Sequence, residues 1–138
     1  MKIEDLVKKI CAEMNAKQED CIGARKCINL SANHFLSAME LVHHELGADA
    51  RLIFATASYL DNVLYWMAEI YCANQGSISV RAKVDAGTAM PSLSTLWPHA
   101  DWQEREAQEL FGIQFVGAND FEPFLVRNAR VQFPHRRQ

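Results

Sequence analysis

The sequence predicts an α+β domain: a mostly antiparallel sheet with helices packed on one side. Three observations predict this fold class. Apolar residues recur at helical spacing in two segments near the amino terminus, strand-like runs fill the middle of the chain, and a charged helix follows them. The 138 residues, 49% of them apolar, suffice for one core and are too few for two. We expect one domain over residues 1–126 and a basic extended tail over residues 127–138.

The first expected element is an amphipathic helix over residues 3–16, because Leu6, Ile10 and their neighbours form an apolar stripe. A polar connector, residues 17–20, follows it. Residues 24–30 are then predicted to form a first strand.

A second helix is expected to begin at Ser31 or Asn33, since both side chains can accept hydrogen bonds from the free amides of a first turn. Phe35 and the apolar residues that follow it at helical spacing share one face. Gly47 is predicted to end this helix.

The sheet is predicted mainly from three runs. Residues 51–57 and 63–72 are rich in branched and aromatic residues and are expected to pair around a turn at 58–62. After a second turn at 74–76, residues 77–84 alternate strictly between apolar and polar. This alternation predicts a strand with one face toward water.

The charged helix carries its own start and stop signals. Pro91 is expected to open a short helical turn ahead of it. Asp101 is a suitable N-cap, and Glu104 stands three residues later, which is capping-box spacing. Gly112 can supply the left-handed residue that ends the helix, and residues 113–116 follow as a brief strand.

Two tryptophans flank the charged residues of this helix. Trp102, Glu106 and Leu110 share one face, so Glu106 is predicted to be partly buried and to have a partner. Trp97 and Trp102 fit two interpretations equally: an interface with another protein, or a local core that caps the helix.

Charge and composition exclude several function classes. The net charge of −3 argues against nucleic-acid binding, which needs a basic surface. The tail holds +4 and the rest of the chain −7, which suits an arm lying on an acidic neighbour or, equally, a solvated end. The sequence has no apolar run long enough for a membrane span and no apolar core of a signal peptide, so we expect a cytoplasmic protein that meets membranes only through partners.

Neither a metal site nor an active site is indicated. The four cysteines, Cys11, Cys21, Cys27 and Cys72, contain no closely spaced pair and are expected to be reduced thiols. A metal site built from Cys21, Cys27 and one of His43 or His44 is the less favoured alternative. The carboxylates at 104, 106 and 109 spread around the helix axis, so an acid/base pair is not expected.

The segment from Trp97 to Gly117 resembles the signature of the 30 kDa subunit family of respiratory complex I. That family also includes the matching subunit of membrane-bound, energy-converting [NiFe] hydrogenases and formate hydrogenlyases. The resemblance covers about residues 30–117. It rests on Trp97, Pro98, Ala100, Asp101, Trp102, Glu104, Arg105, Glu106, Glu109, Leu110, Phe111, Gly112, Ile113, Phe115 and Gly117.

The resemblance implies a non-catalytic assembly subunit or domain that docks on the large, 49 kDa-like subunit and on the adjacent iron-sulfur subunit. No cofactor would bind this chain, and the [NiFe] centre and iron-sulfur clusters would lie in the partner subunits. The implied partner-binding residues are Trp97, Trp102, Glu104, Arg105, Glu106, Glu109, Phe111, Arg127 and Arg130.

One departure from the family pattern favours a branch. Quinone-reducing members usually carry His-Pro and then Leu-Arg-Arg after the glycine at 117, whereas residues 118–126 read Ala-Asn-Asp-Phe-Glu-Pro-Phe-Leu-Val here. The hydrogenase or formate hydrogenlyase branch is therefore favoured over the matching 30 kDa subunit of NADH:quinone oxidoreductase. The alternative from another class is a free-standing α/β module that binds a small molecule or nucleic acid.

Overall fold

The computed structural model describes residues 2–20, 26–85, 87 and 89–117. The elements are α1 (Ile3–Met14), β1 (Lys17–Asp20), β2 (Lys26–Leu30), α2 (Ala32–Leu46), a 3-10 turn (Gly47–Asp49), β3 (Ala50–Leu60), β4 (Val63–Cys72), β5 (Gly76–Lys83), β6 (Met90–Pro91), α3 (Ala100–Phe111) and β7 (Phe115–Val116). Helix α1 is followed by two short strands, and helix α2 by a meander of three long strands; the last helix lies between two short strands.

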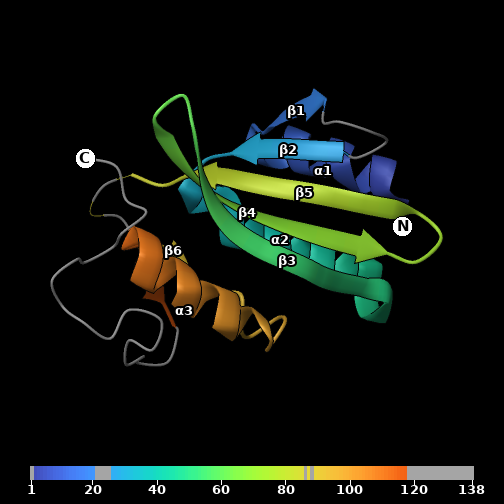
Figure 1. Cartoon of the computed structure of the whole chain (residues 1–138). Helices are drawn as coiled ribbons and strands as arrows, with labels where there is room; N and C mark the ends of the chain where they lie inside the picture. Colours follow the sequence, from blue (N-terminus) through green and yellow to red (C-terminus); the bar gives the residue numbers. More distant parts are fainter. Residues whose placement is uncertain (1, 21–25, 86, 88, 118–138) are drawn as a thin grey trace, which may run out of the picture.

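Five strands form one twisted sheet in the order β1-β2-β5-β4-β3 (Figure 1). The pairs β1–β2, β5–β4 and β4–β3 are antiparallel, and β2 runs parallel to β5 because α2 and two further strands separate them in the chain. The predicted fold class, α+β with a mostly antiparallel sheet, is confirmed.

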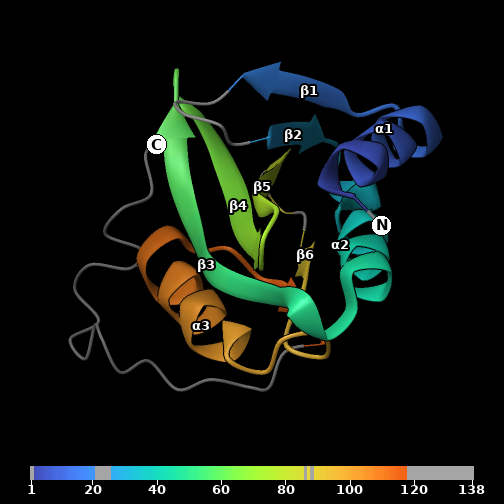
Figure 2. The same ribbon diagram turned by 90° about the vertical axis from the view of Figure 1, so that its right-hand side faces the viewer.

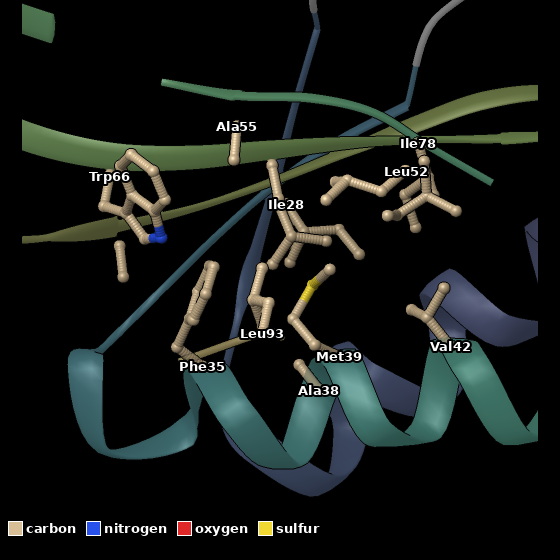
Figure 3. Packing of buried hydrophobic residues seen from close by; sticks show 14 of the residues in the cluster. Ile28, Phe35, Ala38, Met39, Val42, Leu52, Ala55, Trp66, Ile78 and Leu93 are labelled. Carbon is tan, nitrogen blue, oxygen red and sulfur yellow. The ribbon is translucent and has the colours of Figure 1, made fainter. Parts of the chain in front are cut away.

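Helices α1 and α2 lie on one face of the sheet, and α3 lies beside β3 (Figure 2). Phe35, Met39 and Val42 on α2 point toward the sheet and are completely buried there, as the helical spacing predicted (Figure 3). They meet Ile28, Trp66 and other apolar residues from the facing strands. Removing a large core side chain such as Phe35 typically costs about 3–5 kcal/mol, so this layer holds the domain together.

The hairpin of β3 and β4 is longer and tighter than predicted. Its turn contains only Asp61 and Asn62, both with positive φ, so the strands extend into the predicted turn at 58–62. Two positive φ angles match the right-handed twist of the flanking strands, which explains the tight connection. A β-bulge at Ile53 lets Leu52 and Ala55, three residues apart, both face the core.

Two amino-terminal predictions need correction. Residues 17–20 are not a connector: they form β1, which pairs with β2 although its side chains are polar. The first helix ends at Met14, because Asn15 adopts the left-handed conformation that stops it. The predicted strand over 24–30 is found as β2, and its first two residues lie outside the described part.

The face of β5 that was predicted to lie toward water is less exposed than the alternation of apolar and polar residues indicated. Ser79 and its neighbour Glu69 on β4 are both buried there. Further along the same face, Arg81 forms an ion pair with Glu19 and stacks over the ring of Tyr65 at 4.9 Å. This face therefore combines buried polar residues with a paired, stacked arginine instead of simply facing water.

Helix α2 begins and ends at the predicted residues, but the predicted capping hydrogen bond is not made. Ser31 is the N-cap, yet its side chain makes no capping hydrogen bond, and Gly47 follows the last helical residue with a positive φ of 61°. Cys11 and Cys72 carry free thiols, and Cys27 is buried in β2. The fourth cysteine, Cys21, lies outside the described residues.

Candidate functional site

The charged helix belongs to a small unit of its own, residues 90–116. Strands β6 and β7 pair in parallel, and α3 connects them. The Met90 N–H donates to the Gln114 carbonyl at 2.8 Å, and the Ser92 N–H donates to the Val116 carbonyl at 2.9 Å. Pro91 therefore lies in a strand, which corrects the predicted helical turn at that residue; the turn begins later, where the Trp97 N–H bonds to the Leu93 carbonyl.

Glu104 is the internal anchor of this unit. Its side chain is fully buried, at 0% exposure, and its carboxylate accepts hydrogen bonds from the Ser92 hydroxyl at 2.6 Å and the Leu93 N–H at 2.7 Å. Ser94 supports the arrangement, with its hydroxyl 2.7 Å from that of Ser92. Burial raises the pKa of Glu104 above its ordinary value, while the two hydrogen bonds oppose that rise.

The predicted capping box is therefore wrong. The helix begins at Ala100 with His99 as N-cap, and Asp101 lies within its first turn. Glu104 reaches back to the 92–94 turn instead of to the helix's own first amides. A buried carboxylate needs strong donors, and the turn supplies them. Gly112 ends the helix as predicted, with φ 73° and an N–H bond to the Gln108 carbonyl.

Three side chains from this unit cover the open edge of β3. The Trp97 indole N–H donates to the Ala50 carbonyl at 3.2 Å, and His99 Nε2 lies 2.9 Å from the Leu52 carbonyl. The Gln103 side-chain oxygen accepts from the Ala55 N–H at 2.7 Å.

The β-bulge at Ile53 explains why these contacts fall at Ala50, Leu52 and Ala55 along β3. It shifts the outward backbone groups of β3 by one residue, so that the Ala55 N–H faces Gln103. Side chains thus replace the hydrogen bonds that a sixth strand would make.

The outward side of α3 carries Trp102, whose exposure is 56%, and Glu106, which is also exposed. This corrects the prediction that Glu106 is partly buried. The face shared by positions 102, 106 and 110 is the outer one, and positions 100, 104 and 107 face inward. A carboxylate and a large aromatic ring are therefore presented to the surroundings one helical turn apart.

The remaining predicted residues divide between interior and surface. Trp97 is 5% exposed and Glu109 is also buried. Arg105 and Phe111 are half-buried, and the Phe111 ring lies 6.1 Å from that of Tyr59. Because Trp97 and Glu104 are buried, they can contribute to an interface only by fixing the position of α3. Arg127 and Arg130, with the rest of the predicted tail, lie outside the described residues.

Sequence reasoning missed Ser92, His99 and Gln103. A glutamine on a charged helix looks like any solvated residue, and nothing in its spacing indicated a backbone N–H on a distant strand. Ser92 could have been found by asking which donors would satisfy a carboxylate on the inner side of α3.

Within residues 2–20, 26–85, 87 and 89–117, histidine, cysteine and carboxylate side chains nowhere gather in threes as a metal would require. No helix in the same part of the chain combines the length and hydropathy needed to cross a membrane. What the site offers is a rigidly held helix with an aromatic ring and a carboxylate on its outer side.

The chain belongs to the family of the respiratory-chain NADH dehydrogenase 30 kDa subunit, whose model matches residues 12–138. The resemblance seen in the 97–117 segment is thereby confirmed.

Two curated relatives are each named as the C subunit of an NADH-quinone oxidoreductase. One, from Hyphomonas neptunium, is 42% identical over 60 residues, which are 44% of this chain and 30% of that protein. Another, from Citrifermentans bemidjiense, is 29% identical over 126 residues, covering 90% of this chain and 71% of the relative. The match with the first thus spans less than a third of that relative's length.

Two solved structures share the fold. A chain of the membrane-bound sulfane sulfur reductase, an archaeal respiratory membrane complex, superposes with a TM-score of 0.77 at 19% identity and covers 96% of this chain and 82% of the other. The trypsin-resistant fragment of Nqo5 gives a TM-score of 0.73 at 21% identity, covering 88% of this chain and all of the fragment. At these identities the likeness concerns the fold.

Proposed function

We propose that this chain is a non-catalytic assembly subunit or domain of a membrane-associated, multisubunit respiratory oxidoreductase, and that it docks on the large catalytic subunit. The observation that carries the proposal is family membership over residues 12–138, together with the outward-facing α3 that the unit over residues 90–116 holds rigid. In this proposal the chain is peripheral, on the cytoplasmic side, and reaches the membrane through its partners.

The large, 49 kDa-like subunit and the adjacent iron-sulfur subunit are the proposed partners. Electron transfer would run through a [NiFe] centre or its quinone-site counterpart and through iron-sulfur clusters, all held by those partners. The contribution of this chain is mechanical and electrostatic. Arg105, half-buried on α3 between the inner and outer faces, is a suitable residue for testing it.

Two branches of the family compete for the identity of the complex. The sequence that follows Gly117 lacks the His-Pro and Leu-Arg-Arg pattern of quinone-reducing members and favours an energy-converting [NiFe] hydrogenase or formate hydrogenlyase. The names of the curated relatives favour NADH:quinone oxidoreductase. We propose the first branch and keep the second as the alternative.

Affinity purification of the tagged chain from its own host in mild detergent tests the proposal. Mass spectrometry should find a large subunit and iron-sulfur subunits with it. Nickel and hydrogen uptake in the same fraction support the hydrogenase branch, whereas flavin with NADH-dependent quinone reduction supports the alternative. Recovery of the chain alone, under conditions that preserve a known membrane complex, contradicts the assembly role.

Arg105→Ala sharpens the same experiment. The variant should retain its fold by circular dichroism and recover less of the large subunit. Unchanged recovery argues against a docking role for Arg105. Loss of the fold shows instead that Arg105 belongs to the local core around α3.

A further inference from the structure

Helix α3 departs from the ordinary pattern of a surface helix at three positions. Two of its carboxylates, Glu104 and Glu109, are buried, while its largest aromatic side chain, Trp102, is 56% exposed. An amphipathic surface helix normally turns its apolar residues inward and its charges outward. The inward position of Glu104 is explained by the 92–94 turn that it holds. The outward position of Trp102 points to recognition at the surface.

Glu106 lies one turn from Trp102 on the same exposed side. Residues four apart on a helix have Cβ atoms about 5–6 Å from each other, so one partner side chain can touch both. Of the four acidic residues on the helix, Glu104 and Glu109 are buried, Asp101 is half-buried and Glu106 is exposed. The exposed carboxylate of Glu106, one turn from the Trp102 ring, favours a cationic partner.

An arginine fits this pair better than a lysine does. Its planar guanidinium can stack on an indole ring and at the same time donate two hydrogen bonds to a carboxylate. A lysine ammonium is a compact, strongly hydrated charge without a planar face. It therefore cannot stack on the indole ring and donate paired hydrogen bonds to the carboxylate at the same time. Trp and Arg are also the residue types most enriched among interface hot spots.

The platform beneath the pair is rigid, which favours binding. Gln103, next to Trp102 in the chain, is held by the Ala55 N–H, and Glu104 is held by the 92–94 turn. These contacts hold the backbone of the helix beneath Trp102 and Glu106 in place before a partner docks, which lowers the entropic cost of binding.

We infer that the outer side of α3 is a binding site for an arginine side chain of the large subunit, with the guanidinium stacked on Trp102 and paired with Glu106. The inference rests on the proposed function and specifies the chemistry of its docking contact.

The test compares variants of the full-length tagged chain in the purification described above, with the retained large subunit measured over a series of salt washes. Trp102→Leu should lower the apparent affinity about tenfold, while Trp102→Phe, which keeps an aromatic face, should lose less. Glu106→Arg should also lose about tenfold or more, because it places like charges together. Tyr71→Leu and Glu40→Arg, at exposed positions on β4 and α2, are the matched controls and should bind as the wild type does.

The outcomes separate this inference from the proposed function. If the wild type retains no large subunit, the proposed function fails, and the inference fails with it. If the wild type retains the large subunit and Trp102→Leu retains it equally well, only the arginine site is wrong. Equal losses for Trp102→Leu and Trp102→Phe also overturn the stacking contact.

Tryptophan fluorescence of the isolated full chain tests whether the chain's own tail occupies the site instead of the large subunit. Trp66 and Trp97 are buried, so quenching by acrylamide reports mainly on Trp102. We expect Trp102 to be quenched in the isolated chain and protected in the purified complex. Protection in the isolated chain that disappears in the double variant Arg127→Ala, Arg130→Ala would assign the site to the chain's own tail and overturn the inference.

Discussion

The two edges of the five-stranded sheet are protected in different ways. Along β3, an edge of 11 residues, the side chains of Trp97, His99 and Gln103 bond to outward backbone groups. Along β1 the edge has only four residues, Lys-Gln-Glu-Asp, three of them charged. Open strand edges invite pairing with other chains, and both devices prevent it.

The two edges differ in how strongly their protection depends on specific tertiary contacts. The β3 edge depends on a distant segment arriving in one defined geometry, because Glu104 anchors that segment and Gln103 meets a single N–H. The β1 edge depends only on its length and composition. Substitutions near β3 should therefore cost stability, whereas those on β1 should be tolerated.

The largest effect is expected from Glu104→Ala. It leaves the Ser92 hydroxyl and the Leu93 N–H buried without their acceptor, so we expect a loss of about 2–4 kcal/mol in the free energy of unfolding. Urea denaturation measures it. The matched control, Glu106→Ala on the outer side of the same helix, should change stability by less than about 0.5 kcal/mol. Equal effects of the two variants would contradict the anchoring role.

A smaller effect is expected from Gln103→Ala, which removes the acceptor for the Ala55 N–H. The loss should be about 1–2 kcal/mol. Hydrogen exchange at the Ala55 amide should accelerate beyond what the change in global stability explains. Gln18→Ala on β1 is the matched control, and a similar loss there would mean that the two edges do not differ.

The pH dependence of stability gives a third test. The folded protein has a raised Glu104 pKa, so it binds a proton there more tightly than the unfolded chain does, and stability from this group falls as the pH rises from the unfolded to the folded pKa. Glu104→Gln carries no such charge. Its stability relative to the wild type should therefore increase as the pH rises above about 4, the ordinary pKa of a glutamate side chain. A stability difference between the two proteins that does not change with pH would show that ionising the buried carboxylate costs the folded protein no free energy.

The smallest effect belongs to the β1 edge. Glu19→Gln weakens the ion pair with Arg81, whose partner atoms remain partly open to water. We expect a loss of at most about 1 kcal/mol, reduced further at high salt. A larger, salt-independent loss would show that β1 is fixed as firmly as the β3 edge.

Sequence periodicity predicted most of the fold because the core residues repeat at the period of their element. Phe35 and the apolar residues that follow it marked the inner side of α2, and the branched and aromatic run over residues 63–72 marked β4. The pattern failed for β1, since polar residues that pair through their backbone leave no apolar signal. The turn at Asp61 and Asn62 was placed correctly and its length was overestimated.

For the candidate site, the sequence located the helix but assigned its inner face wrongly. Trp102 and Leu110 suggested that the face at 102, 106 and 110 was buried, whereas the small Ala100 and Ala107 permit the close approach on the other side. Which carboxylate is buried depends on donors from the 92–94 turn, which no local pattern reveals. The contacts of Gln103 and His99 with β3 are likewise long-range.

The cover of the β3 edge also sets an order of events during synthesis. Strand β3 is translated before the Trp97, His99 and Gln103 that shield it. A nascent chain that has formed the β3–β4–β5 meander therefore presents a bare strand until the 90–116 segment emerges, and such edges are prone to aggregation. The longer the delay between the emergence of β3 and that of the 90–116 segment, the larger the share of chains that can aggregate before they reach the native state.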